Sequence, residues 1–191
     1  RERILDQALA RVAAGGFAAL TMQALAEDVG IATGSLYRHF SNKGELAAEV
    51  FACASQREVD ALAATLSAPG SAPQRLAAGV QQFAARAWYS RRLAYALIAE
   101  PVEPQVDEQR LIYRRAYAEL FGDLLLEGMS AGQFALQPPA LTAACLVGAI
   151  AEALVGPLAP AAQGPQADSA QLAAVSLALE HFCLRAVGEI G

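Results

Sequence analysis

Apolar residues recur at helical spacing along most of this chain, with polar residues at the positions between them. No run of β-branched residues alternates with a period of two, so no β-strand is predicted. Near the amino end the pattern stops at Gly15-Gly16, a pair typical of a helix carboxyl end. The inward positions before that stop are Ile4, Leu5, Ala8, Leu9 and Val12. The whole pattern predicts an all-α fold of about nine helices.

Two short helices are predicted next. Thr21 has the side chain of an N-cap, and Gly30 ends the helix that it begins after about two turns. The inward residues of that helix are Met22, Leu25, Ala26 and Val29. A third short helix is predicted from Thr33 to about Phe40, with Leu36 and Phe40 both directed inward because they are four residues apart.

A capping-box pattern, Asn42-x-x-Glu45, predicts the start of a long fourth helix that ends near Ser67. Turn residues divide the rest of the chain. The further predicted elements are a helix from Pro73 to about Tyr89, a helix capped by Ser90 that ends before Pro101, a turn over 100–104, a helix from about Val106 to Met129, a loop between Ser130 and Pro139, a helix over 140–156, a loop over 157–166 and a helix over 168–188. We expect a domain at 1–45, joined by the fourth helix to a second domain at 46–191.

The composition is that of a globular protein, with 55% hydrophobic and 17% charged residues. The formal net charge of −5 gives no overall attraction to nucleic acid, so DNA binding would have to come from a local patch. Cys53, Cys145 and Cys183 lie far apart without the spacing of metal ligands, and we expect packing thiols. No metal and no cofactor are therefore expected. Nothing in the sequence reads as a signal peptide, and we expect a cytoplasmic protein.

One segment, Leu141–Leu158, approaches the length and apolarity of a membrane-spanning helix. It is interrupted by Gly156-Pro157, is rich in weakly hydrophobic alanine, and lacks basic or aromatic flanks. These features favour a helix buried on both sides within a soluble assembly, and no membrane partner is expected.

A local basic patch is present in the stretch TGSLYRHFSNK, at Thr33–Lys43. Residues 29–44 contain no acidic side chain, and Lys43 is the only lysine in the chain. Two short helices joined by a tight turn at Val29-Gly30-Ile31 have the geometry of a helix-turn-helix. Such a unit presents the amino-terminal residues of its second helix to the major groove, which here are Thr33, Gly34 and Ser35.

The stretch from Ile4 to about Leu46 resembles the DNA-binding signature of TetR-family transcriptional repressors. The matching residues are Thr21, Leu25-Ala26, Gly30-Ile31, Ser35-Leu36-Tyr37, His39-Phe40, Lys43 and Leu46. The resemblance implies that Thr33, Gly34, Ser35 and Gln23 line the bases. It also implies that Thr21, Tyr37, His39 and Lys43 hold the phosphate backbone, and Arg38 lies on the same solvent-exposed side. In addition, Lys43 adds its charge to the positive end of the fourth helix, where a phosphate binds well.

One position departs from the family pattern. Ala32 stands where these proteins often have a serine that caps the recognition helix. We expect Thr33 to take over the capping, which would leave its hydroxyl less free to contact a base.

A small-molecule site is predicted in the second domain. The helix at 106–129 carries Arg110, Tyr113, Arg114, Tyr117 and Phe121 in one stripe. With side chains from earlier helices, the predicted ligand-binding set is Phe83, Trp88, Tyr95, Glu100, Tyr113, Arg114, Tyr117 and Phe121. The alternative is a plain core in which Arg114 and Glu100 form an ion pair. An anionic, partly hydrophobic effector is favoured only if Arg114 faces the cavity unpaired.

A dimer interface is predicted at the two carboxyl-terminal helices, 140–156 and 168–188, as the resemblance also implies. The first has a ridge of small residues, Ala144, Gly148, Ala151 and Val155, and the second has a face formed by Leu172, Val175, Leu179, Phe182 and Ala186.

The predicted function is that of a homodimeric repressor that binds a palindromic double-stranded operator and is released by an unknown small-molecule effector. The alternative is a ligand-binding or sensing protein that keeps the helix-turn-helix only as a scaffold. An enzyme is not expected, because His39 and His181 have no catalytic arrangement around them.

Overall fold

The structure is a computed structural model, and it describes residues 1–160 and 169–188. Over these residues the chain is all-α, as predicted, with nine α-helices, one short 3-10 helix and no β-strand. The elements are α1 (Glu2–Gly15), η1 (Phe17–Ala19), α2 (Met22–Val29), α3 (Thr33–Leu36), α4 (Lys43–Leu66), α5 (Ala72–Tyr89), α6 (Arg91–Ile98), α7 (Pro104–Ser130), α8 (Pro139–Leu158) and α9 (Ser169–Ala186).

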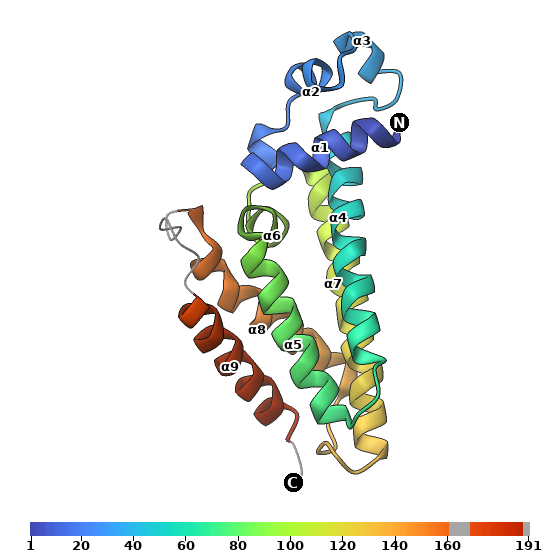
Figure 1. Ribbon diagram of the computed structural model, residues 1–191. Helices are drawn as coiled ribbons and strands as arrows, with labels where there is room; N and C mark the ends of the chain where they lie inside the picture. Colours follow the sequence, from blue (N-terminus) through green and yellow to red (C-terminus); the bar gives the residue numbers. More distant parts are fainter. Residues whose placement is uncertain (161–168, 189–191) are drawn as a thin grey trace.

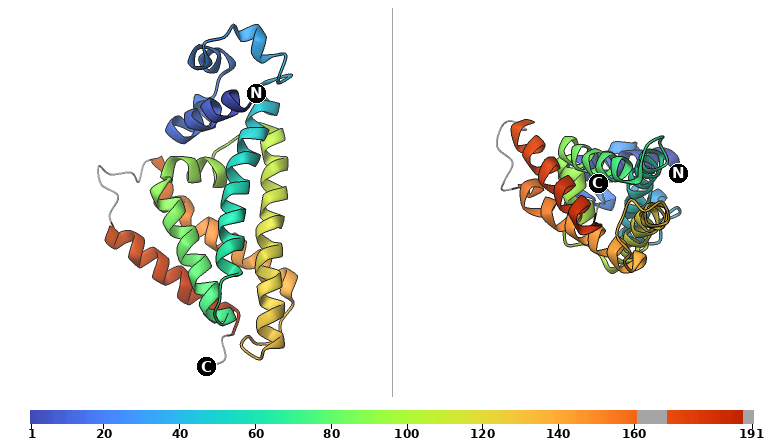
Figure 2. Two further views of the ribbon diagram at one scale, coloured as in Figure 1. Left: turned by 45° about the vertical axis from the view of Figure 1, so that its right-hand side comes forward. Right: turned by 90° about the horizontal axis from the view of Figure 1, so that it is seen from below.

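The molecule is elongated, with α1, α2 and α3 at one end and the long helices extending away from them (Figures 1 and 2). Helices α4 and α7 both begin near this amino-terminal head and run side by side in the same direction. Helix α6 lies under α1, so the head rests on the ends of α4, α6 and α7. Helices α8 and α9 cover one side of the remaining bundle, with α9 packed against α5.

Two hydrophobic cores hold these parts together. The core of the head contains the inward residues predicted for the first helices, and it also takes in Val50, Phe51, Ala96 and Val106 from α4, α6 and α7. The second core lies between α4, α5, α7, α8 and α9. Because α4 and α7 contribute to both cores, a displacement of either helix in the body is transmitted directly to the packing of the head.

Two predicted helix boundaries were wrong. The third helix ends at Leu36 instead of Phe40, because the backbone tightens there: the amides of His39 and Phe40 both donate to the Leu36 carbonyl. Helix α8 was predicted to end at Gly156, before Pro157, yet it continues through Pro157 to Leu158. The Pro157 carbonyl there accepts a hydrogen bond of 2.5 Å from the Arg91 guanidinium. The described residues include only 157–160 of the predicted loop over 157–166. The predicted start of the last helix at 168 lies outside them.

The face predicted for dimerisation on the last helix is also corrected. Leu179 is buried, and Leu172 and Val175 pack against the core of their own chain. Large apolar side chains on the outside of α9 are instead Leu177 and Phe182, at 51% and 49% exposure. The small-residue ridge of α8 does lie at the surface, since Ala144 and Gly148 are exposed.

Helix α8 is long and apolar enough to cross a membrane by length and composition alone. A single helix of this kind is weak evidence for a span, because core helices of soluble proteins meet the same criterion. The residues that α8 buries, Ala143, Leu146, Ile150, Leu154 and Leu158, form one continuous face against the body.

Candidate nucleic-acid interface and ligand cavity

The first helix of the helix-turn-helix, α2, begins and ends where the sequence predicted. The Thr21 hydroxyl accepts a hydrogen bond of 3.2 Å from the Ala24 amide, which caps α2. Gly30 then takes the left-handed conformation, with φ of 74°, and its amide closes the carboxyl end of α2. Leu36 and Phe40 are fully buried beneath α3, so the opposite side of that helix is turned outward.

All nine side chains predicted to contact DNA are at least partly exposed. Tyr37 is 53% exposed although it is a large aromatic residue, and Arg38 and His39 beside it are exposed as well. The expectation that Thr33 caps α3 was wrong, because Ala32 is the N-cap and no side chain makes the capping hydrogen bond. The Thr33 hydroxyl therefore remains available to a base.

The amino end of α4 has the predicted cap with one difference. Asn42 Oδ1 accepts from the Glu45 amide at 2.9 Å, but Glu45 reaches back to the Ser41 amide instead of that of Asn42. The hydrogen bond from the Ser41 amide lowers the pKa of Glu45. Gly44 is buried against the Gln105 side chain at the start of α7, so this helix end is pressed against the body.

Lys43 has a partner that the sequence did not indicate. Its ammonium group lies 2.7 Å from a carboxylate oxygen of Glu103, the residue immediately before α7. Partial burial is the largest single influence on Glu103 and opposes its ionisation. The hydrogen bond from Lys43, a backbone hydrogen bond and the charge of Lys43 together outweigh burial, so the pKa of Glu103 is lowered. The lysine predicted to bind a phosphate is therefore already neutralised by a carboxylate from the body.

A second contact between head and body is built around Glu100, which is only 7% exposed. Its carboxylate accepts from the amides of Phe17 and Ala18 at 3.1 and 3.3 Å, and Arg92 approaches it at 3.3 Å. Arg92 also donates to the Gly15 carbonyl at 2.5 Å. Glu100 and Arg92 thus fasten the carboxyl end of α1 to α6.

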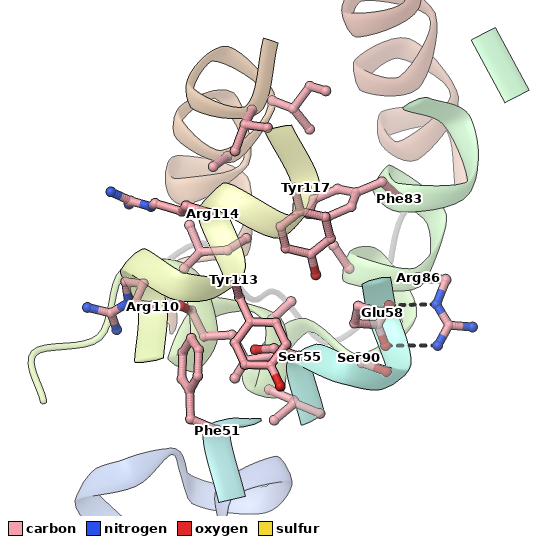
Figure 3. A pocket seen from close by; sticks show the side chains of 18 of the residues that line it. Phe51, Ser55, Glu58, Phe83, Arg86, Ser90, Arg110, Tyr113, Arg114 and Tyr117 are labelled. Carbon is pink, nitrogen blue, oxygen red and sulfur yellow. Dashed lines mark hydrogen bonds and ion pairs between the residues drawn. The ribbon is translucent and has the colours of Figure 1, made fainter. Parts of the chain in front are cut away.

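A cavity lies in the body between α4, α5, α6, α7 and α8, and Figure 3 shows it from close by. The space between its walls amounts to about 870 Å³ when the solvent at its mouth is counted. Its lining is mainly apolar and aromatic, with Phe83 and Tyr117 meeting edge to face at 5.7 Å between ring centroids. Ser55, Glu58, Arg86, Ser90 and Tyr113 add polar groups. A mainly apolar lining with a few polar groups is typical of small-molecule sites.

Residues 4–50 match the model of the family described as "Bacterial regulatory proteins, tetR family". The head of the chain is therefore similar to this family. Two curated relatives are 48% identical over 46 residues: the HTH-type transcriptional repressors KstR of Rhodococcus jostii (strain RHA1) and of Mycolicibacterium smegmatis (strain ATCC 700084 / mc(2)155). This match spans 24% of the chain and 22% of the length of each relative, so it concerns the head alone.

Solved structures resemble the fold of this chain over nearly its whole length. The fatty acid degradation regulator FadR of Bacillus halodurans has a TM-score of 0.76 at 19% identity, over 96% of this chain and 97% of that one. FadR of Bacillus subtilis, solved in complex with stearoyl-CoA, has a TM-score of 0.79 at 18% identity, over 100% and 99%. At these identities the likeness establishes the fold alone.

The cavity is lined by five of the eight predicted ligand-binding residues: Phe83, Tyr113, Arg114, Tyr117 and Phe121. Trp88, Tyr95 and Glu100 do not line it. Trp88 is buried in the core with the Arg91 guanidinium 4.3 Å from its ring centroid. Tyr95 packs against the body core, and Glu100 belongs to the contact with α1. The alternative pairing of Glu100 with Arg114 was wrong, since Glu100 pairs with Arg92.

Sequence reasoning missed the polar wall of the cavity. Phe51, Ser55 and Glu58 share one face of α4, and Arg86 and Ser90 come from α5 and its end. Arg86 donates to both carboxylate oxygens of Glu58 at 2.6 and 2.8 Å. The helical spacing of 51, 55 and 58 could have identified the α4 face. The pairing with α5 could not be read from the chain, because it depends on how the two helices pack.

The arginines of α7 do not supply free charge inside the cavity. Arg110 donates to Asp107 and to the carbonyls of Leu97 and Glu100, and burial lowers its pKa. Arg114 is exposed, and Figure 3 shows its guanidinium directed away from Tyr117 and Phe83. The condition for an anionic effector, Arg114 facing the cavity, is therefore not met.

Proposed function

We propose that this chain is a ligand-responsive transcriptional repressor that binds a palindromic DNA operator as a homodimer. The observation that carries the proposal is the exposed surface of the helix-turn-helix over Thr33–Lys43, where Tyr37, Arg38 and His39 are turned to solvent above a fully formed core. A unit kept only as a scaffold would have no reason to expose an aromatic residue beside Arg38 and His39.

In this proposal α3 enters the major groove. Thr33, Gly34 and Ser35 approach the base edges, where Gly34 permits close contact, and Gln23 reaches them from α2. Thr21, Tyr37, Arg38, His39 and Lys43 bind phosphates on either side. The assigned units are 1–45 for DNA binding and 46–191 for effector binding and dimerisation, and such a protein works in the cytoplasm.

The effector site is the cavity of the body. The fold-related FadR of Bacillus subtilis was solved in complex with stearoyl-CoA, which supports a role for this architecture in small-molecule binding. Helix α4 passes from the head along the cavity wall, with Lys43 at one end and Phe51, Ser55 and Glu58 beside the ligand space. A ligand that binds more tightly when α4 is slightly displaced stabilises that conformation. In it the distance between the two heads of the dimer no longer matches the operator, and DNA is released.

The dimer is assigned to the exposed faces of α8 and α9. Successive major-groove half-sites are about 34–36 Å apart, so two heads held at a fixed distance read a palindrome together. A small change in that distance prevents both heads from binding at once.

The test is a mobility-shift titration of ligand-free protein on DNA from the region upstream of its own gene. We expect a mobility shift that persists in the presence of excess random DNA. We also expect the affinity to fall steeply with salt concentration, because phosphate contacts release counterions. Equal affinity for random DNA of the same length would contradict an operator-binding repressor. No shift at low salt would favour the alternative, a sensing protein with an idle head.

A further inference from the structure

The lining of the cavity has an apolar part and a polar part, which we call the polar wall. Phe83, Phe121, Val147 and Ile150 form the apolar part, contributed by α5, α7 and α8. Ser55 and Glu58 on α4 and Arg86 on α5 form the polar wall, and Tyr117 reaches toward that wall from α7 (Figure 3). A ligand that fills the space therefore places an apolar surface on one side and a polar group on the other.

Two hydroxyl groups at this wall make no hydrogen bond within the described residues. Ser55 is 3% exposed and lines the cavity, yet its hydroxyl makes no hydrogen bond to any residue in the described ranges 1–160 and 169–188. Tyr117 likewise has no hydrogen-bond partner within those ranges, although it makes an edge-to-face contact with Phe83. Burial raises the pKa of Tyr117, so its hydroxyl stays protonated and can donate. Buried hydroxyls are normally paired, which makes these two ready partners for a ligand group.

The charges around the cavity are already balanced. Glu58 and Arg86 neutralise each other through two hydrogen bonds, Arg110 is held by Asp107 and backbone carbonyls, and Arg114 is turned outward. An ionised carboxylate or ammonium group entering this space would lose its hydration without gaining a free counter-charge. A hydroxyl or carbonyl group has a much smaller desolvation penalty, and two unpaired hydroxyls can bind it.

We infer that the effector is an uncharged, mainly apolar molecule with a hydroxyl or carbonyl group, which Ser55 and Tyr117 bind in the cavity of the body. This inference rests on the proposed function in taking the cavity as the effector site. It replaces the anionic effector that a free Arg114 would have favoured.

The experiment is isothermal titration of the full chain at pH 7.5 with two matched pairs of probes. One pair is 1-decanol and decanoate, and the other is 2-naphthol and 2-naphthoate, so chain and ring shapes are both tested with and without charge. At least one uncharged probe is expected to bind ten times or more tighter than its anion. The Ser55→Ala and Tyr117→Phe variants are each expected to weaken that binding about three- to tenfold.

Tyr95→Phe is the matched control, because Tyr95 packs against the body core without lining the cavity. It should leave the affinity of the uncharged probe unchanged. Tighter binding of either anion, failure of both uncharged probes to bind, or wild-type affinity in both hydroxyl variants would overturn the inference. None of these outcomes affects operator binding by ligand-free protein, which the mobility-shift titration tests separately.

Discussion

Lys43 combines two features that determine its effect on DNA binding: it lies at the positive end of α4, and Glu103 neutralises it in the free protein. Lys43→Ala should weaken binding to every DNA sequence by a similar factor, because a phosphate contact carries no base information. The slope of log affinity against log salt concentration should also fall by about one. Arg114→Ala, which removes an exposed cation from the body, is the control. A salt slope unchanged in Lys43→Ala would exclude a phosphate contact by Lys43.

Glu103 competes with the phosphate for the same ammonium group, so its removal should favour DNA. Glu103→Gln is expected to raise affinity for operator and random DNA about three- to tenfold at low salt, since an exposed ion pair of this kind is weak. Glu108→Gln, an exposed carboxylate five residues away, makes the same charge change without contacting Lys43. Equal gains in both variants would show that only net charge matters. When Lys43 is also replaced by alanine, Glu103→Gln should raise DNA affinity no more than Glu108→Gln does.

The three cysteines differ in accessibility, and the difference can be measured directly. Cys53 and Cys145 are exposed, whereas Cys183 lies on the inward side of α9 and is fully buried. Burial raises the pKa of Cys183 to about 11, so at pH 8 almost none of it is the reactive thiolate. Titration of native protein with an aromatic disulfide reagent at pH 8 should detect two thiols quickly, and a third only after unfolding in urea. Three thiols reacting at one rate in native protein would disprove the burial of Cys183.

At the residue scale, sequence reasoning succeeded where partners are close along the chain. Thr21 with Ala24 and Asn42 with Glu45 are three residues apart, and such caps follow from residue type and spacing. It failed for Glu100, because the Phe17 amide that Glu100 binds lies 83 positions away and depends on how α6 meets α1. Long-range polar contacts leave no periodic signal in the sequence.

At the scale of elements, Gly16 ends α1 in a conformation that only glycine adopts readily, with φ of 74° and ψ of −176°. A Cβ atom there would also collide with the Arg92 and Glu100 side chains that fasten the head. Gly16→Ala should therefore lower the free energy of unfolding by about 3 kcal/mol, and it should also weaken DNA binding. Urea unfolding followed by circular dichroism measures the first effect, and a mobility-shift titration measures the second.

Gly30→Ala is the informative comparison for Gly16→Ala. Gly30 has the same φ of 74°, but a Cβ atom there would meet nothing within 4 Å. The expected loss in unfolding free energy is about 1 kcal/mol, from backbone strain alone. Equal losses in the two variants would mean that the contact of Glu100 and Arg92 with α1 contributes nothing beyond the turn itself.

The order of helices was predictable because glycines, prolines and capping residues stand at almost every boundary. The exceptions have physical causes. Proline was taken to end α8, but Pro157 lies one residue before the end of the helix, where its missing amide removes only one helical hydrogen bond, and α8 continues to Leu158. The third helix was extended to Phe40 on the strength of its buried position. A turn with both His39 and Phe40 bonded to Leu36 buries the same ring without a regular helix.

At the scale of the whole molecule, the dimer interface on α8 and α9 stays a prediction, and part of the face predicted on α9 packs inside its own chain. Packing against α5 turns Leu172, Val175 and Leu179 inward, a choice that depends on the neighbouring helix and cannot be read from the α9 pattern alone. What remains outside on α9 is Leu177 and Phe182, and Ala144 and Gly148 are exposed on α8. Exposed leucine and phenylalanine side chains together with a small-residue ridge are suited to close packing against a second copy of the same helices.

The dimer prediction is therefore best tested on Leu177 and Phe182. Leu177→Arg and Phe182→Arg should each weaken self-association at least tenfold in sedimentation analysis, because an unpaired cation would be buried at the interface. Binding to a palindromic operator should fall further than binding to a single half-site, since the dimer joins two weak contacts into one strong one. Leu136→Arg, at a leucine that is 90% exposed in the loop before α8, should change neither measurement. A wild-type chain that sediments as a monomer at micromolar concentration would rule out this interface, and cooperative reading of two half-sites would then need another explanation.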